Sequence, residues 1–385
     1  MHQEPSGVWI MAYTTIDDPS AYFQIATWTG NDTDGRSITN DGNSDLQPDL
    51  VWIKARSVAY GHSVHDSSRG FGSSGSEKNL VTSNNEAENG GSHIYGGVSA
   101  ASSDGFTTFE GTDSGNPFAN NNENSRTYVA WQWKANGGTT TTNDASETSV
   151  GSVDSVYQAN TTAGFSIVTY TGTGSGDITL AHGLGKVPNL IMGKTRNQAY
   201  GWRVYHSSVG HLQAMALNST NAASNNNAWG GTAPTSAIFT AGRGSDENMN
   251  YGSGDTIVAY CFAEIQGFSK FGGYTANNND DGPFIYTGFK PRYVMIKKRS
   301  AAGEWHILDT KRESPSGNPV DQDLYAGGAY AEGSGAQYMD FLSNGFKLRS
   351  DHTGTNGEDT SQTYVYVAFA EQPFVTSSGV PATAR

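Results

Sequence analysis

The sequence predicts an all-β protein built from three repeated antiparallel β-sandwich modules. Aromatic and β-branched residues are spread along the 385 residues in short runs separated by Gly, Asn, Asp and Ser, which is the pattern of short strands and turns. No window of eleven or more residues repeats its apolar positions with the 3.6-residue period of a helix. One motif also recurs three times with constant internal spacing, and this indicates three units of one fold.

The recurring motif is a proline followed by a short apolar run and a lysine. It begins at Pro48, Pro188 and Pro291, and a lysine stands six residues after each proline. The positions fourteen residues after the prolines hold His62, Trp202 and Trp305. The positions eighteen residues after them hold Asp66, His206 and Asp309. Because equal offsets at three places rarely arise by chance, we interpret the motif as an internal repeat.

Matching strand sequences mark the beginning and the end of each copy. The first strand is expected at 23–30 (FQIATWTG), 165–172 (FSIVTYTG) and, more loosely, 268–275 (FSKFGGYT). The last strand is expected at 128–131 (YVAW), 257–260 (IVAY) and 366–369 (YVAF). These matches place the three modules at 21–135, 163–266 and 267–376.

The stretch between the first two modules, residues 136–162, is rich in Thr, Ser, Gly and Asn. This composition predicts a linker, with one strand near 153–157. The second and third modules follow one another directly at Gln266, so we expect those two to pack together.

Each module is expected to contain five to seven strands. The motif proline opens a strand, where its missing N–H costs least. The apolar run after it, such as LVWI at 50–53, reads as a buried strand, and residues 345–350 alternate between a buried and a wet face. Short strands and Gly/Asn turns at this density predict a β-sandwich, of which the jelly roll is one form.

Charge and composition exclude several classes of protein. The chain has 23 basic and 37 acidic residues and a net charge of −14, which argues against a nucleic-acid binder. The single cysteine, Cys261, lies in an apolar run and is expected to be a buried thiol. No segment approaches the ~20 apolar residues of a membrane span, and residues 1–5 do not resemble a signal peptide. We therefore expect synthesis in a cytoplasm and no membrane insertion.

The residues that could suggest catalysis or metal binding are interpreted more simply as structural residues. Asp66 and Asp309 are each followed three residues later by an arginine, Arg69 and Arg312, and we expect both pairs to close turns. His62 and His65 have ligand-like spacing but no further ligand pattern, so no metal site is assigned to them. Calcium remains an alternative at three Asn/Asp loops, which are 31–34, 40–43 and 278–281. No catalytic residue is assigned, and we do not expect an enzyme.

Aromatic residues in polar loops are the candidate binding residues. Seven of them stand among Gly, Ser and Asn, and they are Tyr60, Tyr95, Tyr200, Trp229, Tyr251, Tyr325 and Tyr330. Tyr and Trp with small polar neighbours form adaptable recognition surfaces. The alternative is that these rings fold back as loop anchors or are buried between subunits.

With these motifs in view, the chain resembles a family of marine bacteriophage virion proteins described as tail-fibre-like structural proteins. The strings that carry the resemblance are 11–17 (MAYTTID), 23–30, 47–54, 66–70 (DSSRG), 128–135 (YVAWQWKA), 257–271, 286–291 (YTGFKP), 342–347 and 375–385. The family is lectin-like and sandwich-like, without assigned catalytic residues. The resemblance therefore implies a virion protein, released on lysis, with a part in host recognition.

This resemblance leads to a functional hypothesis. Residues 1–20 would attach to other virion proteins, residues 377–385 would form a tail, and the aromatic loops would contact host-surface glycan or protein. By analogy with fibres, we expect a homotrimer. The alternatives are an architectural virion component, such as a capsid decoration, head fibre or tail collar protein, and a glycan-cleaving tailspike. A tailspike needs an acidic pair in a cleft and usually shows shorter β-helix repeats.

Overall fold

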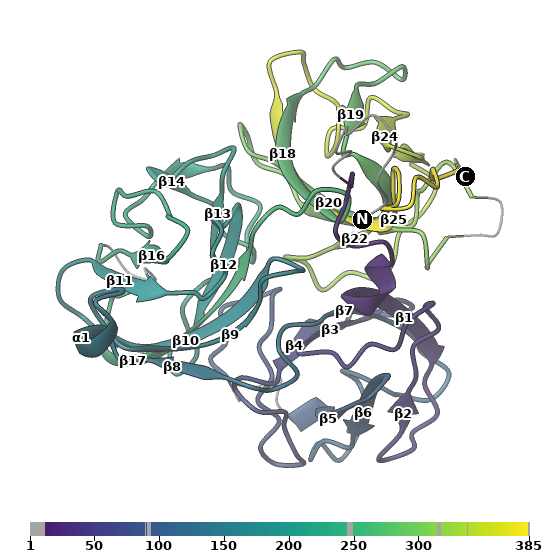
Figure 1. The fold of residues 1–385 in the computed structure, drawn as a ribbon. Coiled ribbons are helices and arrows are strands. Elements are labelled where there is room, and N and C mark those ends of the chain that lie inside the picture. Colours follow the sequence, from purple (N-terminus) through teal and green to yellow (C-terminus); the bar gives the residue numbers. More distant parts are fainter. Residues whose placement is uncertain are drawn as a thin grey trace.

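A computed structural model describes residues 12–88, 90, 94–244, 249–313, 317–336 and 338–383. Strands dominate these ranges, and the helices that they contain are short, a 3-10 turn η1 (Pro19–Ala21) and α1 (Ala145–Thr148). Every strand pairing is antiparallel, which confirms the predicted all-β sandwich class. Figure 1 shows three lobes that meet at a common centre, and we call residues 12–135, 136–266 and 267–383 the first, second and third lobe.

The first lobe contains a large and a small sheet. The large sheet has the order β1 (Phe23–Thr29), β7 (Thr127–Trp133), β3 (Leu50–Ala55) and β4 (His62–Asp66). The small sheet has the order β2 (Ser37–Ile38), β6 (Gly105–Phe109) and β5 (Gly97–Ser102). A cluster of buried apolar residues, including Trp28, Val51 and Phe106, fills the space between the two sheets.

The second lobe repeats the order of the large sheet and extends it. Its sheet runs β13 (Arg203–His206), β12 (Leu190–Thr195), β17 (Ser253–Phe262), β10 (Phe165–Thr173), β9 (Ser155–Asn160) and β8 (Thr141–Asn143). Two short pairs complete the lobe, β11 (Ile178–Ala181) with β16 (Ile238–Ala241) and β14 (Gln213–Ala214) with β15 (Ser224–Asn225).

The prediction of a linker at 136–162 is therefore wrong for the parts of this segment that form regular structure. It contains β8, α1 and β9, and β9 pairs with β10 from Ser155 opposite Tyr170 to Asn160 opposite Phe165. A strand was expected only near 153–157. The segment was misread because a polar strand at a sheet edge is stabilised by backbone hydrogen bonds, which composition does not reveal.

The third lobe again has a large and a small sheet. The large sheet runs β18 (Ser269–Thr275), β25 (Thr363–Pro373), β20 (Phe289–Lys298), β21 (Trp305–Asp309) and β22 (Leu324–Tyr325). The small sheet runs β19 (Phe284–Tyr286), β24 (Gly345–Leu348) and β23 (Met339–Leu342). The first four strands of the large sheet have the same order as β1, β7, β3 and β4 in the first lobe.

The strand register corrects the expected match at the end of the third lobe. Leu50, two residues after its motif proline, lies opposite Trp133, and the corresponding Tyr293 lies opposite Phe369. Phe369 therefore takes the place of Trp133 and not that of Trp131, so the expected match of 366–369 with 128–131 is wrong by two residues. A shift of two keeps every side chain on the same face of the sheet, and the sequence pattern therefore hides it.

The large sheets bury both of their faces. One face covers the small sheet of its own lobe, and the opposite face turns to the centre of the molecule. Apolar residues from all three lobes form one cluster there, for example Phe23, Phe262 and Phe369. The ring centroids of Phe23 and Phe369 lie 5.0 Å apart, and those of Phe262 and Phe369 lie 5.8 Å apart. All three lobes thus share a core, whereas only the second and third were expected to pack together.

The predicted attachment segment contacts two lobes, because Asp18 and Ser20 accept hydrogen bonds from Ser44 of the first lobe while Tyr13 reaches the third. Tyr13 donates a hydrogen bond of 2.7 Å to the carbonyl oxygen of Gly288. The backbone N–H of Ser377 donates one of 2.6 Å to Asp17. Residues 1–11, the remainder of the expected attachment segment, lie outside the described residues. Within the described ranges, no helix combines the length and the apolar character that a membrane crossing requires.

Candidate functional site at the junction of the three lobes

Buried hydrogen bonds join neighbouring lobes at the positions eighteen residues after the motif prolines. Asp66 Oδ2 in the first lobe accepts a 2.7 Å hydrogen bond from the hydroxyl of Tyr260 in the second lobe. Asp309 Oδ2 in the third lobe accepts a 2.9 Å hydrogen bond from Nε1 of Trp131 in the first lobe. Trp131 and Tyr260 lie opposite equivalent motif residues, so the two contacts are equivalent as well.

An ion-pair chain extends the first of these contacts. Arg69 donates to Asp66 across 2.5 Å within the turn and to Glu88 across 2.8 Å. Glu88 also accepts from Arg196 of the second lobe at 2.7 Å. The side chains of Asp66 and Arg69 are fully buried. The Asp66–Arg69 pair thus closes its turn and also anchors the second lobe. Each buried charge of the pair has a partner, which offsets the cost of removing it from water.

The third lobe repeats this chain toward the first lobe. Arg312 pairs with Asp309 at 2.7 Å and with Glu332 at 2.8 Å, and Glu332 pairs with Arg56 of the first lobe at 2.6 Å. Arg56 and Arg196 both stand eight residues after a motif proline, as does Arg299. Sequence reasoning missed these arginines, although their constant offset was a visible signal. Nothing in the local sequence indicated the two glutamates.

The remaining junction, between the second and third lobes, has neither the aspartate–arginine pair nor the aromatic donor, as the residues described there show. His206 stands in place of the aspartate, and its Nε2 lies 3.1 Å from the carbonyl oxygen of Tyr366. Val209 replaces the arginine, and Val367 takes the position of Trp131 and Tyr260. A buried aspartate without an arginine or a donor would be costly, and a neutral imidazole avoids that cost. Burial lowers the pKa of His206 to about 4.

The large rings fourteen residues after the prolines make equivalent contacts at all three junctions. Trp202 Nε1 donates to the carbonyl oxygen of Val81 at 2.8 Å, and Trp305 Nε1 donates to that of Ala216 at 2.9 Å. His62 Nδ1 accepts from an indole, so its Nε2 carries the proton and donates to the carbonyl oxygen of Tyr325 at 2.9 Å. Each lobe is thereby joined to a loop of the next.

The loops held in this way line an open pocket of about 520 Å³ to which all three lobes contribute. Its lining is mostly polar, with Ser83 from the first lobe, Asn218 from the second, and Glu304 and Tyr330 from the third. Ser83 and Asn218 each lie two residues after a carbonyl that accepts one of the ring contacts. The pocket therefore exists only because the lobes meet.

The seven predicted aromatic residues have different surroundings. Tyr330 is 56% exposed and lines this pocket. Trp229 is only 1% exposed and packs against Tyr205 in the core of the second lobe, so its assignment to a binding surface is corrected. Its loop folds inward because the large ring gains more from burial than from exposure to water. The other five are half-buried, and they are Tyr60, Tyr95, Tyr200, Tyr251 and Tyr325. The seven residues therefore do not form one surface.

Buried amides occupy two of the three loops considered for calcium. Asn122 Nδ2 donates to Asn31 Oδ1 at 2.9 Å and to the carbonyl oxygen of Thr33 at 3.0 Å. Asn356 Nδ2 donates to the carbonyl oxygen of Asn279 at 2.8 Å in the corresponding loop of the third lobe. An amide thus takes up oxygens that could otherwise face a cation. Among the described residues, no group of three or more His, Cys, Asp or Glu is arranged to hold a metal.

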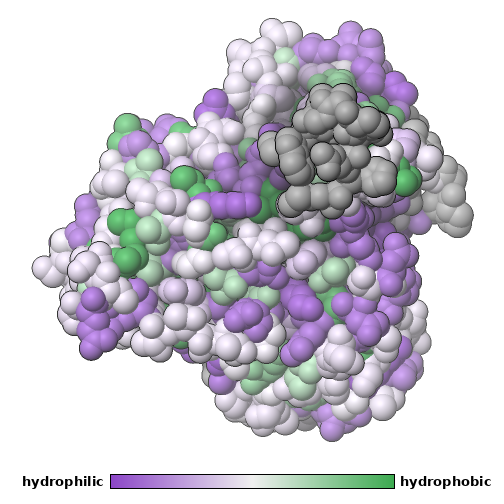
Figure 2. Space-filling view, in the orientation of Figure 1, coloured by the Kyte–Doolittle hydropathy of each residue, from purple (hydrophilic) through white to green (hydrophobic). Residues whose placement is uncertain are grey.

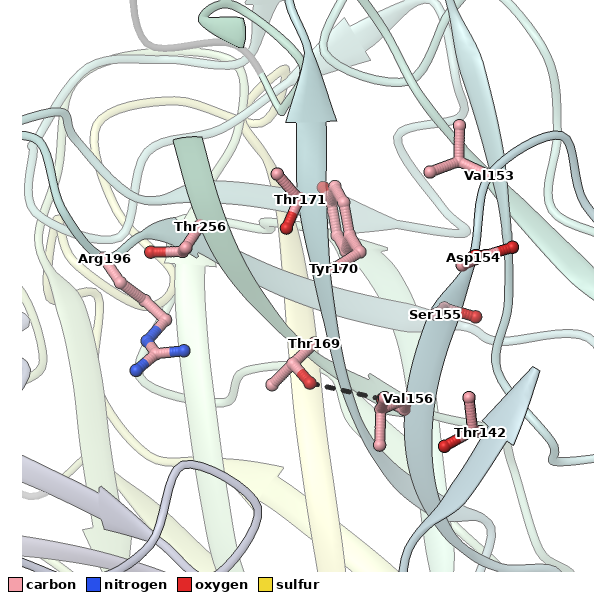
Figure 3. Close-up of a pocket in the computed structure, with 10 residues that line it drawn as sticks. All are labelled: Thr142, Val153, Asp154, Ser155, Val156, Thr169, Tyr170, Thr171, Arg196 and Thr256. Carbon is pink, nitrogen blue, oxygen red and sulfur yellow. Dashed lines mark hydrogen bonds between the residues drawn. The ribbon is translucent and has the colours of Figure 1, made fainter. Parts of the chain in front are cut away.

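A second hollow lies on the second lobe, away from the junction pocket. It is a groove of about 470 Å³, and Figure 3 shows Thr169 and Thr171 of β10 along it with Arg196 at one end. Because Arg196 already pairs with Glu88, the groove has less charge to offer a ligand than its composition suggests. On the face of the molecule drawn in Figure 2, apolar residues form only small separate groups among polar ones.

A family model described as a domain of unknown function (DUF7483) matches residues 18–373. The chain belongs to this family. The DUF7483 match covers the large sheets of all three lobes, so the junction and its pocket lie inside the family domain. No curated protein matches the chain.

Proposed function

We propose that the chain is a structural and binding protein of a bacteriophage virion, which adheres to the host surface without breaking bonds. The observation that carries the proposal is the junction pocket, where an exposed tyrosine stands beside hydroxyl, amide and carboxylate groups. These groups lie on loops that hydrogen bonds between lobes hold in place. Such a fixed, polar, aromatic-bearing surface suits the recognition of host-surface glycan or protein.

We also propose that the three lobes are copies of one module. Residues at equal offsets from the motif prolines make equivalent contacts between lobes, as Trp202 and Trp305 illustrate. The shared core thus supplies within one chain the contacts that a fibre trimer makes between chains. This arrangement favours a monomer over the homotrimer expected from the resemblance.

The alternative is an architectural role as a capsid decoration, head fibre or tail collar protein. The closed arrangement of three lobes favours it, because a unit with internal threefold character matches the symmetry axes of a particle. In that case the junction pocket would contact a neighbouring virion protein.

Antibodies against the purified chain test both roles on phage particles whose genome encodes it. We expect gold-labelled antibody to decorate intact particles, and Fab fragments to slow adsorption to host cells in proportion to occupancy. Decoration without slower adsorption would favour the architectural role. Particles that carry no label, while the chain is detected in the lysate, would contradict the virion proposal.

A further inference from the structure

We propose that the junction pocket is a sugar site, which takes a neutral pyranose of a host-surface polysaccharide with one ring face against Tyr330. The inference rests on the proposed binding function and names its ligand class. The pocket volume of about 520 Å³ is in the range that small ligands occupy. It has room for one or two sugar rings.

Tyr330 supplies a positioned aromatic face. Its ring lies directly over Gly328, where an added Cβ would come within 2.5 Å of the ring. The ring of Tyr325 packs edge-on against it, with 5.7 Å between centroids. One side of the ring is thus fixed by the protein, while 56% of the residue remains exposed. An exposed, oriented aromatic ring is the group that stacks on the C–H face of a sugar.

The polar groups of the pocket match the hydroxyls of a sugar. Asn218 Oδ1 accepts a 2.9 Å hydrogen bond from the backbone N–H of Trp202, which leaves the two N–H groups of the amide as donors. Ser219 Oγ accepts from the N–H of Asn221, so its own proton is available. Glu304 adds a carboxylate acceptor on the opposite lobe. Donors and a charged acceptor together can bind neighbouring hydroxyls, each of which donates and accepts.

Contacts between lobes hold the pocket walls in position. Thr82 Oγ1 in the first lobe donates to the carbonyl oxygen of Ala326 in the third at 2.6 Å. The N–H of Gly303 in the third lobe donates to the carbonyl oxygen of Thr220 in the second at 2.8 Å. A pocket that is already organised loses little entropy when a weak ligand such as a sugar binds.

Charge selects the kind of sugar. Glu304 lines the pocket, and the nearby Lys297 directs its Nζ to the carbonyl oxygens of Thr220 and Gly303, at 2.8 and 2.6 Å. These two hydrogen bonds direct the Lys297 ammonium to the protein's own carbonyl oxygens, so it offers little counter-charge to an anion in the pocket. The chain carries a net charge of −14 in addition. Neutral sugars are therefore favoured over uronic or sialic acids.

Isothermal titration of the full chain with methyl glycosides of glucose, galactose, mannose and N-acetylglucosamine tests this inference, with glucuronate and sialic acid alongside. We expect at least one neutral glycoside to saturate with a dissociation constant on the order of 1–10 mM, as one small ligand in a polar pocket would. Tyr330→Ala should weaken that binding at least tenfold. Gly328→Ala should weaken it as well, because it displaces the ring.

The matched control is Phe284→Ala, which removes an aromatic ring of similar exposure (46%) outside the pocket and should leave sugar binding unchanged. Unchanged thermal unfolding of each variant shows that it is folded. The inference is overturned if no neutral glycoside saturates, if the acidic sugars bind more tightly, or if the Tyr330 variant binds like the original. Adsorption that Fab fragments still block in that case would leave the binding function standing and place it elsewhere on the chain.

Discussion

The hydroxyl of Tyr260 donates a 2.7 Å hydrogen bond to Asp66, 194 residues away, where both side chains are buried between the first and second lobes. The equivalent bond from Trp131 to Asp309 joins the first and third lobes. In both cases the aspartate also holds the arginine three residues after it. In each of these two lobes the aspartate thus closes a turn with its arginine and also fixes the position of a neighbouring lobe.

Removing one of these aspartates should destabilise the whole chain. Asp309→Ala leaves Arg312 without its nearest carboxylate and Trp131 without an acceptor, so we expect the free energy of unfolding in urea to fall by about 3–5 kcal/mol. Asp41→Ala is the control, because Asp41 is exposed and pairs with Lys311 at the surface. It should change stability by less than about 0.5 kcal/mol. A loss below about 1 kcal/mol for the first variant would contradict a structural role for the network.

The junction between the second and third lobes should tolerate an aspartate at position 206 only when an arginine is added at position 209. His206→Asp buries an unpaired carboxylate, and we expect it to cost about 3 kcal/mol or more. Adding Val209→Arg restores the arginine at the spacing of the other two turns and should recover about 1–3 kcal/mol of that loss. The coupling energy comes from a double-mutant cycle measured by urea unfolding. Additive effects would show that the three junctions are not equivalent.

Acid should weaken the fold through its buried histidines. Burial lowers the pKa of His65 to about 3 and that of His206 to about 4, below the ordinary value near 6.5. Above pH 6.5 both are neutral in either state. Below it the unfolded chain takes up protons that the folded chain refuses, so stability falls until the folded pKa is reached.

As the pH falls from 6.5 to 4, each such histidine lowers the free energy of unfolding by up to about 1.4 kcal/mol per pH unit. Urea unfolding at pH 7, 6 and 5 measures the total slope. His206→Gln should reduce that slope by the amount that corresponds to about one proton. The stability of this variant at pH 7 is compared with that of the original chain separately. An unchanged slope would mean that His206 is not held neutral.

The oligomeric state follows from the shared core. Because the three large sheets already bury their central faces on one another, we expect light scattering at micromolar concentration to give the mass of one chain, 40.9 kDa. A mass three times larger would restore the trimer expected from the fibre analogy. Dilution of such a trimer would then show whether it is held by weak contacts.

The sequence by itself determined the all-β class and several of the strands and turns. Equal offsets from Pro48, Pro188 and Pro291 predicted three β-units, and the spacing of Asp66 and Arg69 located a turn. These features are readable because they are local. A strand alternates with a period of two, and an aspartate reaches an arginine three residues later within one turn.

Only the tertiary structure decided which lobes touch, which strands joined the second sheet, and where the pocket lies. Tyr260 contacts Asp66, and Ser83 and Asn218 line one pocket, across sequence separations that no local pattern encodes. Trp229 reads like an exposed loop residue, but the fold of its lobe buries it. The physical reason is the same throughout: burial and long-range pairing depend on how the large sheets turn their second faces to a common centre.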